Sequence, residues 1–373
     1  MNKQTYLPGL NGLRFFAAFA VIVTHLELIK MYKGLPHLWS NPNIAELGAL
    51  GVIFFFVLSG FLITFLMFKE EESFGEISIK NFFLRRVFRI FPLYYLIVFI
   101  GFFLVFDWEF IRIPSQYIPA SQNYLSYLGY YLFLIPNLSI GAFDSSFPHI
   151  GQLWSIGVEE HFYLMWPFVF ILSKDKKLRV FIMFFVFILA IKLTFWGLIK
   201  MNQFSSDSAL FWSNLWASEK LESMAIGGVG AYVWFKKPKS LKFFSFWPGI
   251  FVSIGLVFLG INFSPTTLQD GMHIIYSILF LGIIIRVLQD VRWQSLLEYK
   301  PFNYLGQISF GLYVYHLLIV TIVINCLLLL DFQNQLLFNI LYYQVSIVLT
   351  IVISHISYKY FEAYFLKLKQ KFK

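Results

Sequence analysis

The chain has 373 residues, of which 58% are hydrophobic and only 13% are charged, about half the charged share of an ordinary soluble domain. This composition excludes a soluble globular protein and predicts an integral membrane protein, organised as a single membrane-embedded domain over residues 1–373 with no appended soluble domain. The net charge of +9 is expected to reflect membrane topology, so no nucleic-acid partner is implied. The single cysteine, Cys326, excludes an internal disulfide framework.

The first apolar run contains "GLRFFAAFAVIVTH", from Gly12 to His25, and continues to about Met31 without a small-residue cleavage site, so we expect a retained first membrane span. Arg14 and His25 are eleven residues apart, which is about 1100° of helical rotation, so they share a face to within roughly 20° with about 16 Å of rise between them. Ionisable residues inside spans are costly and indicate a functional site. The alternative is that Arg14 reaches the headgroups and His25 makes a polar contact at the outer interface.

Apolar runs of about 20 residues are long enough to cross a bilayer as helices. Ten such runs lie near 13–31, 49–68, 90–106, 156–173, 178–198, 216–235, 246–262, 270–288, 304–330 and 336–358. The expected fold class is therefore an all-α integral membrane protein, with about ten transmembrane helices in one bundle.

A further run, at 124–140, is shorter, rich in tyrosine and interrupted by Pro136. Basic clusters, which the positive-inside rule assigns to the cytoplasm, lie at 69–89, 173–179, 236–242 and 286–300 and in the tail from Lys359. The first two clusters share a side only if two of the three apolar runs between them cross. We therefore predict that 124–140 is re-entrant or interfacial, and that both termini are cytoplasmic.

The third expected span begins with "FFLRRVFRIFP" at 82–92, which contains Arg86 and Arg89 three residues apart and hence on one helical face. Two guanidinium groups on one face offer planar forks of donors that suit phosphate. The pattern predicts a phosphate clamp. The alternative is a positive-inside anchor that contacts only lipid phosphates.

The segment "QLWSIGVEEHFYLMWP" at 152–167 is the least lipid-like of the expected spans. Ser155, Glu159 and Tyr163 recur every four residues and form a polar stripe that begins beside Trp154. A carboxylate there is suited to orienting a histidine or to holding sugar hydroxyl groups. The alternative is a solvated helix start whose acidic residues interact with the helix dipole.

Further along, "GQISFGLYVYHLLI" at 306–319 buries His316 in the ninth expected span, where a structural histidine or a supporting residue of the site are both reasonable. Asp270 and His273 are three residues apart and form either a charge relay or a helix start with an aspartate cap. No cysteine and histidine spacing matches a zinc site, and neither a phosphate-binding glycine loop nor a nucleophile-elbow serine is present. We expect no metal and no bound cofactor.

Taken together, these segments resemble the acyltransferase family 3, the bacterial membrane-bound O-acyltransferases of surface polysaccharides. The motifs that carry the resemblance occur in the family's order over nearly all of the chain: "LRFFAAFAVIVTH", "LGVIFFFVLSGFLIT", "RRVFRIFPLYY", "QLWSIGVEEHFYLMWP", "GQISFGLYVYHLLI" and "SYKYFEAYF". One departure is at the end, where the family usually has glutamate, a basic residue and proline, and this chain has Glu362, Ala363 and Tyr364.

The resemblance implies transfer of an acyl group, typically acetyl, from cytoplasmic acyl-CoA to a hydroxyl of a cell-surface or lipid-linked glycan, in the bacterial cytoplasmic membrane. Acyl-CoA is then the donor substrate, and no bound cofactor is implied. The family's essential histidine corresponds to His25 and its partner arginine to Arg14, with Arg14 also available to CoA phosphates. The remaining correspondences are the paired arginines at Arg86 and Arg89, the motif glutamate at Glu159 with Phe162 and Tyr163, and supporting positions at Trp154, Ser155 and His316.

Some members of the family carry a soluble esterase-like domain after the last span. This sequence ends soon after that span, so we expect any acyl relay to be completed by the bundle or by another protein. The competing hypothesis is a transporter or flippase for a lipid-linked sugar, in which Arg14, His25 and Glu159 form a polar pathway. A membrane scaffold without chemistry fits poorly with so many ionisable groups inside spans.

Overall fold

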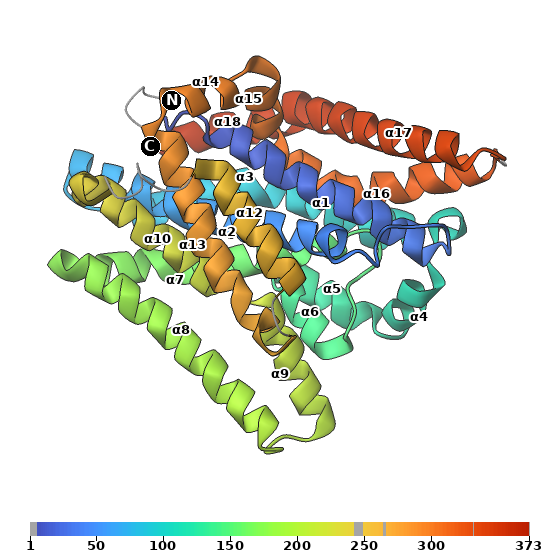
Figure 1. The fold of residues 1–373 in the computed structure, drawn as a ribbon, viewed down its shortest axis with the longest axis horizontal. Coiled ribbons are helices and arrows are strands. Elements are labelled where there is room, and N and C mark those ends of the chain that lie inside the picture. The colour runs from blue at the N-terminus through green and yellow to red at the C-terminus, as the bar shows by residue number, and fades with distance from the viewer. Residues whose placement is uncertain (1–5, 242–248, 264–265, 331, 373) are drawn as a thin grey trace. The chain divides into compact units, whose positions relative to one another are not determined.

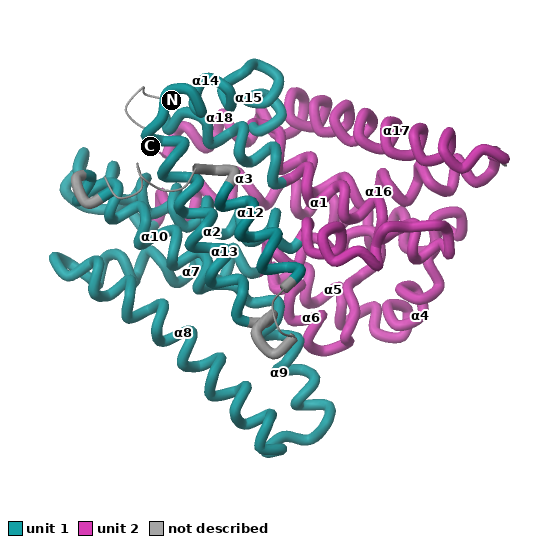
Figure 2. The backbone as a smooth tube through the Cα atoms, viewed as in Figure 1, with its two compact units in different colours: residues 1–17, 49–79, 158–306 teal, residues 18–48, 80–157, 307–373 magenta. Residues whose placement is uncertain are grey.

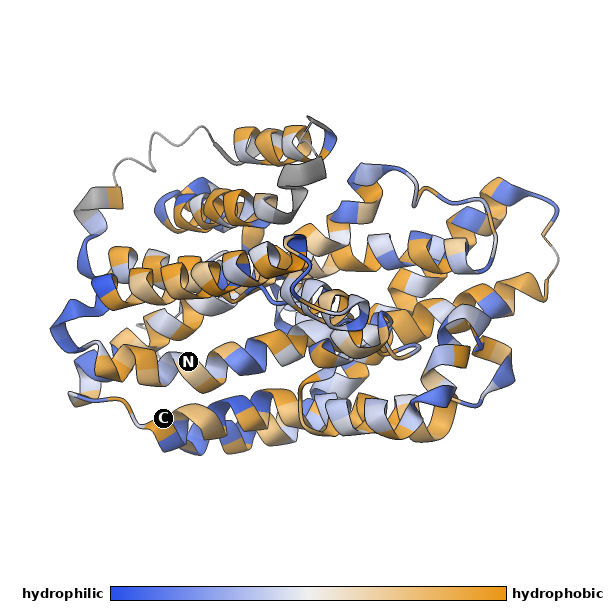
Figure 3. Cartoon of the chain, turned by 90° about the horizontal axis from the view of Figure 1, so that it is seen from below, coloured by the Kyte–Doolittle hydropathy of each residue, from blue (hydrophilic) through white to orange (hydrophobic). Residues whose placement is uncertain are grey.

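The computed structural model describes residues 6–241, 249–263, 266–330 and 332–372, which form helices joined by turns, with no β-strand among them (Figure 1). A helix suits this composition because it pairs each backbone N–H and C=O within its own segment, as the hydrocarbon region of a bilayer requires. Strongly hydrophilic residues are concentrated at helix ends and in the connections, as Figure 3 shows. The predicted all-α integral membrane class is confirmed.

Within the described ranges, seven helices are long and apolar enough to cross a bilayer. They are α1 (Leu10–Tyr32), α2 (Pro42–Phe74), α3 (Ile79–Phe99, extended by π-helical turns to Val105), α8 (Lys177–Lys200), α13 (Thr266–Gln289), α16 (Ser309–Leu328) and α17 (Gln335–Ile356, extended by further helical turns through α18, Ala363–Lys369). Each coincides with one of the ten runs expected from the sequence.

The other three expected runs are also helical but are shorter or more polar. They correspond to α7 (Trp154–Leu172), to the pair α9 (Ser206–Ser218) and α10 (Leu221–Lys236), and to α12 (Gly249–Phe263). The run 216–235 is not one continuous helix, because the backbone is extended at Glu219, between α9 and α10. For these three segments, crossing of the membrane stays a prediction.

The tyrosine-rich run at 124–140 is divided between α5 (Tyr124–Leu132) and α6 (Pro136–Phe143), which follow α4 (Pro114–Gln122). A helix of nine residues is only about 14 Å long, less than half of a bilayer's hydrocarbon thickness. The tyrosines hold α5 against α3: the Tyr94 hydroxyl donates to the Tyr131 carbonyl at 2.8 Å, and the Tyr124 hydroxyl donates to the Phe102 carbonyl at 3.0 Å. Neither helix is long enough to cross.

The helices form two compact units, each assembled from three separate stretches of chain (Figure 2). Unit 1 contains Met1–Ala17, Ala49–Ile79 and Val158–Gly306, and unit 2 contains Ala18–Gly48, Lys80–Gly157 and Gln307–Lys373. Helices α1 and α7 each begin in one unit and end in the other. The motif residues are therefore divided between the units, and each unit is described separately below.

Unit 1 is built around a close crossing of α2 and α10. A Cβ atom placed on Gly60 would lie 1.9 Å from the carbonyl oxygen of Met224, and one on Gly227 would lie 2.1 Å from the carbonyl oxygen of Val57. Without side chains at these glycines the two backbones come into contact, which is how helices pack tightly in lipid. Beside this crossing, the Trp166 indole of α7 donates to the Thr64 hydroxyl at 2.7 Å.

Unit 2 is organised by the antiparallel pair α16 and α17, which lie side by side in Figures 1 and 2. Helix α16 is the most enclosed of the seven candidate spans, with 83% of its apolar window buried. The Tyr342 hydroxyl of α17 donates to the Leu26 carbonyl of α1 at 3.2 Å, so α1 joins the same unit. The last turns of α1 and the first turns of α16 are thereby held in one packed structure.

Candidate active site

His25 of α1 and His316 of α16 are in contact, although 291 residues separate them in the chain. His316 Nε2 lies 3.1 Å from His25 Nδ1, and the ring centroids are 4.8 Å apart. His316 is fully buried, whereas His25 is partly exposed. The two histidines belong to separate sequence motifs, and the fold brings them together.

The hydrogen bonds of the pair define the protonation of both rings. His316 Nδ1 lies 2.7 Å from the Tyr313 carbonyl and His25 Nδ1 lies 2.9 Å from the Val21 carbonyl. A carbonyl oxygen only accepts, so both Nδ1 atoms carry a proton. The Nε2 atom of His316 is then an acceptor for the His25 Nδ1–H, and His25 Nε2 keeps its lone pair, with no hydrogen-bond partner among the described residues.

Tyr313 links the histidine pair to the start of α7. Its hydroxyl donates to the Gln152 carbonyl at 2.9 Å and lies 2.6 Å from the Ser155 hydroxyl. The Gln152 side-chain amide in turn donates to the Val314 carbonyl at 2.6 Å. Ser155 therefore supports the turn of α16 that positions His316, and Trp154 lies partly exposed at the first residue of α7.

The arginine pair lies on α3 in unit 2. The Arg89 guanidinium is 3.8 Å from the Glu362 carboxylate and lies over the Phe310 ring, 5.7 Å from its centroid, while Arg86 lies over Phe82 at the same distance. Glu362 belongs to the C-terminal motif that departs from the family's pattern at Ala363 and Tyr364. It restrains Arg89 in the structure, although 3.8 Å is a loose ion pair that leaves the guanidinium able to bind other anions.

In unit 1, Glu159 of α7 has two hydroxyl donors. Ser59 of α2 donates to Oε1 at 2.8 Å, and Tyr163 donates to Oε2 at 3.1 Å. The predicted stripe is thus realised for Glu159 and Tyr163, whereas Ser155, four residues earlier, belongs to unit 2. Arg14 lies partly exposed on α1, the same continuous helix that carries His25.

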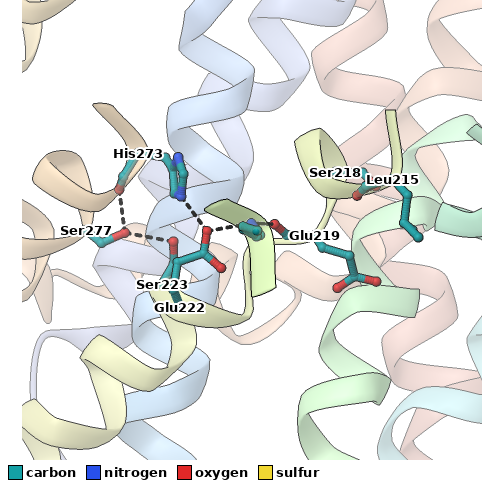
Figure 4. A network of polar contacts seen from close by, with 8 residues as sticks. Leu215, Ser218, Glu219, Glu222, Ser223, His273 and Ser277 are labelled. Atoms are coloured by element: carbon teal, nitrogen blue, oxygen red, sulfur yellow. Dashed lines mark hydrogen bonds and ion pairs between the residues drawn. The ribbon is translucent and has the colours of Figure 1, made fainter. Parts of the chain in front are cut away.

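A second polar cluster in unit 1 was not predicted from the sequence. The fully buried Glu222 of α10 accepts, through Oε1, from Lys192 of α8 at 2.6 Å and from His273 of α13 at 2.5 Å. Figure 4 shows Ser223 and Ser277 beside this contact, 2.8 Å apart. The available signal was the presence of ionisable residues inside three of the apolar runs: Lys192, Glu222 and His273.

The cluster also connects to the glutamate motif. The backbone carbonyl of Glu219 accepts from Lys192, and the Glu219 carboxylate contacts His161 Nδ1 of α7 at 2.8 Å. His273 was considered with Asp270 as a charge relay, and here its Nε2 contacts Glu222. The side chain of Asp270 lies outside the described residues. The cluster cross-links α7, α8, α10 and α13.

Among the described residues, no group of three or more histidine, cysteine, aspartate or glutamate side chains is arranged to hold a metal ion. One further histidine, His149, lies in the connection before α7 and is 3% exposed. Burial, reinforced by the positive charge of Lys33, lowers the pKa of His149 to about 4. It is therefore a neutral residue of the supporting structure at neutral pH.

Comparison with known proteins gives one family. The sequence profile described as "Acyltransferase domain" matches residues 7–359. The O-acetyltransferase OatA of Staphylococcus aureus (strain NCTC 8325 / PS 47) is 28% identical over 378 residues, covering 97% of this chain and 57% of OatA. A Staphylococcus aureus (strain COL) protein provisionally named the O-acetyltransferase SACOL0978 is 28% identical over 383 residues, covering 98% of this chain and 58% of that protein. The chain thus spans less than two thirds of these relatives, and no solved structure matches it significantly.

Proposed function

The chain belongs to the acyltransferase family defined by that domain, and from this premise we propose that it transfers an acyl group, acetyl in the simplest case, from acyl-CoA to a hydroxyl of a cell-surface or lipid-linked glycan. The names of the relatives at 28% identity support O-acetyl transfer. The proposed location is the bacterial cytoplasmic membrane, with both termini in the cytoplasm. The acyl-CoA donor is inferred from the arginine pair.

The observation that carries the proposal is the state of His25 Nε2, which has a lone pair and no hydrogen-bond partner among the described residues. The hydrogen bonds of Nδ1 to Val21 and His316 hold the ring in place. A general base must be neutral, oriented and able to reach the acceptor. The carbonyl of Val21 and the imidazole of His316 orient the ring, and the His25 side chain is partly exposed. This is the arrangement that a histidine base requires.

In the proposed reaction, the acceptor oxygen attacks the thioester carbonyl carbon while His25 Nε2 takes the hydroxyl proton. The C–S bond then breaks, and the imidazolium returns the proton to the departing CoA sulfur, so that the products are the ester and the free thiol. His316 accepts from Nδ1–H throughout, which favours the cationic form of His25 in the transition state. The alternative, in which His25 Nε2 attacks the thioester directly, produces an acyl-histidine intermediate.

The donor's phosphates are assigned to the arginine residues. Arg86 and Arg89 lie one turn apart on α3, and Arg89 is only loosely bound to Glu362. Arg14 is a third candidate for this role. On the acceptor side, the residues proposed to support the glycan are Glu159 with Tyr163 in unit 1, and Trp154 and Ser155 in unit 2.

The test uses the purified full chain in lipid nanodiscs, with acetyl-CoA, a glycan acceptor and a thiol-reactive dye that detects released CoA. Substitution His25→Gln keeps a hydrogen-bonding side chain of similar size but removes the base, and loss of a general base costs about 10²–10⁴ in rate. We expect acyl transfer to be abolished while donor binding and the melting temperature are retained. Rapid acid quenching of the wild type distinguishes the two mechanisms, because only the nucleophilic one leaves a labelled acyl-enzyme.

An active His25→Gln variant would refute both roles of His25. A transporter for a lipid-linked sugar, the competing hypothesis, would release no CoA and would show no thermal shift with acetyl-CoA.

A further inference from the structure

A hollow of about 480 Å³ lies in unit 1 at the start of α8, and its lining includes none of the residues assigned to acyl transfer. Its polar lining consists of Lys176, Arg179 and Lys237, with Asp175 as the one acid and Tyr232 beside them. Three cations and one carboxylate give the hollow a net positive charge. A phosphate group is the ligand chemistry that this lining favours.

Two cations of the hollow, Lys176 and Arg179, differ from the lysines around them. Lys177 contacts the Glu71 carboxylate at 2.9 Å and lies over the Phe170 ring, and Lys236 lies over Phe68 and Phe235. Those lysines are therefore satisfied by the protein. Lys176 and Arg179 are exposed and form no ion pair within the described part of the chain, so their charges remain available.

Apolar side chains line the rest of the hollow along α8. Ile182 and Met183 line it and are 45% and 60% exposed. Helix α8 is the least enclosed of the seven candidate spans, with only 6% of its apolar window buried. A span so exposed faces lipid, so a molecule whose charged head binds the cations would lay its hydrocarbon chain along these residues.

The first turn of α8 adds to the attraction. Lys176 is the N-cap residue of α8, and Arg179 lies in the first turn. The N-terminus of this 24-residue helix is the positive end of its dipole, which adds to the positive charge of these residues. Basic pockets between transmembrane helices are suited to anionic lipid headgroups.

We propose that this hollow is a binding site for an anionic phospholipid, with the phosphodiester held by Lys176, Arg179 and Lys237 and an acyl chain lying along Ile182 and Met183. The site is independent of the proposed acyl transfer. A soluble phosphate-bearing molecule such as CoA would use the cations but not the apolar wall. The lipid is favoured because the wall lies on the least enclosed of the seven candidate spans.

The test measures binding of dioleoyl phosphatidylglycerol to the delipidated full chain by native mass spectrometry. Dioleoyl phosphatidylcholine controls for the acyl chains, and CoA controls for phosphate without chains. We expect the anionic lipid to bind with a dissociation constant at least tenfold lower than the zwitterionic lipid, and CoA not to displace it. Displacement by CoA, or equal binding of the two lipids, would overturn the proposal.

Two pairs of substitutions with the same charge change locate the site. Lys176→Gln with Arg179→Gln should weaken phosphatidylglycerol binding about thirtyfold, since each cation near a membrane surface contributes about a fivefold factor. Arg292→Gln with Lys300→Gln removes two exposed cations elsewhere in unit 1 and should have little effect. Asp175→Asn should strengthen binding several-fold, which no loss of folding can imitate. An equal loss in both double variants would show a general charge effect and contradict the site.

Discussion

At the scale of single residues, the centre of the molecule's proposed chemistry is the contact between His25 and His316. The distance of 3.1 Å, together with the two backbone carbonyl acceptors, leaves one nitrogen of His25 with a lone pair. In this proposal His316 does not contact the glycan hydroxyl that accepts the acyl group. It is a positioning residue, which acts by holding His25 in one orientation and one tautomer.

Substitution of His316 tests that role. His316→Phe keeps an aromatic ring but removes the acceptor for His25 Nδ1–H, and we expect kcat to fall about ten- to a hundredfold, the cost of losing one oriented hydrogen bond in the transition state. Donor KM should be unchanged. His316→Gln retains an acceptor oxygen and should recover part of the rate. Equal loss in both variants with a lowered melting temperature would indicate a purely structural residue.

His149 gives the folded chain a specific dependence on pH. Its pKa is about 4 in the folded protein, against an ordinary value of about 6.5, because burial and the charge of Lys33 oppose protonation. As the pH falls below about 6.5, the unfolded chain binds the proton first, so stability declines from there toward pH 4, by up to about 3 kcal/mol.

The melting temperature measured between pH 7.5 and pH 4.5 checks this. His149→Asn should reduce the slope, since asparagine also tolerates the positive φ of 61° found there. An identical slope in wild type and variant would assign the loss to other groups.

At the scale of elements, the helices are joined by contacts that depend on particular small or charged residues. Glu222, Lys192 and His273 connect α10, α8 and α13 through a buried carboxylate. Gly60 and Gly227 let α2 and α10 meet backbone to backbone. Arg89 connects α3 to the end of α17 through Glu362.

The crossing of α2 and α10 predicts which glycines tolerate a methyl group. Gly60→Ala or Gly227→Ala would place Cβ within about 2 Å of a carbonyl oxygen, which overpacks the interface and should cost more than about 3 kcal/mol of stability. Gly197→Ala on α8 meets nothing within 4 Å and should be neutral or stabilising by up to about 1 kcal/mol. Melting temperatures in detergent measure both, and similar values for all three variants would refute the close crossing.

Helix α3 predicts where the donor binds. Arg86→Ala and Arg89→Ala should each raise the KM for acetyl-CoA about ten- to a hundredfold, the cost of a charge-assisted phosphate contact. Arg85→Ala is the matched control, because the Arg85 guanidinium donates to the Phe372 carbonyl at 2.9 Å. Unchanged donor KM in the Arg86 and Arg89 variants would favour an anchor that contacts only lipid phosphates.

At the scale of the whole molecule, topology follows from how the segment between 90 and 173 meets the membrane. Helices α5 and α6 are each too short to cross, so Asp107 and Asp144 should lie on the same, outer side. Both residues are exposed and suited to labelling.

Single cysteines at these two positions, in a Cys326→Ser background, should react with an impermeant maleimide in intact cells. A cysteine at Lys174 should react only after permeabilisation. Labelling of Asp107 and Asp144 from opposite sides would reverse the placement of the basic cluster at 173–179.

Much of this architecture was predictable from the sequence because apolar run length and charge are local properties. Within the described part of the chain, seven of the ten expected runs are helices long and apolar enough to span. The helical period predicted that Glu159 and Tyr163 share a face of one helix, and in the structure the Tyr163 hydroxyl donates to Glu159 at 3.1 Å. The break at Glu219 was missed, because a single extended residue changes hydropathy very little.

The sequence by itself determined that this is an all-helical membrane protein of the acyltransferase family, and which residues share a face of their own helix. Only the tertiary structure decided which residues of different helices meet. The contacts of His25 with His316, of Arg89 with Glu362 and of Glu222 with Lys192 and His273 join segments that are distant in the chain. Helical periodicity specifies direction within one helix, whereas such partners are selected by how helices pack, which depends on side-chain volume and the pairing of buried charge across the whole unit.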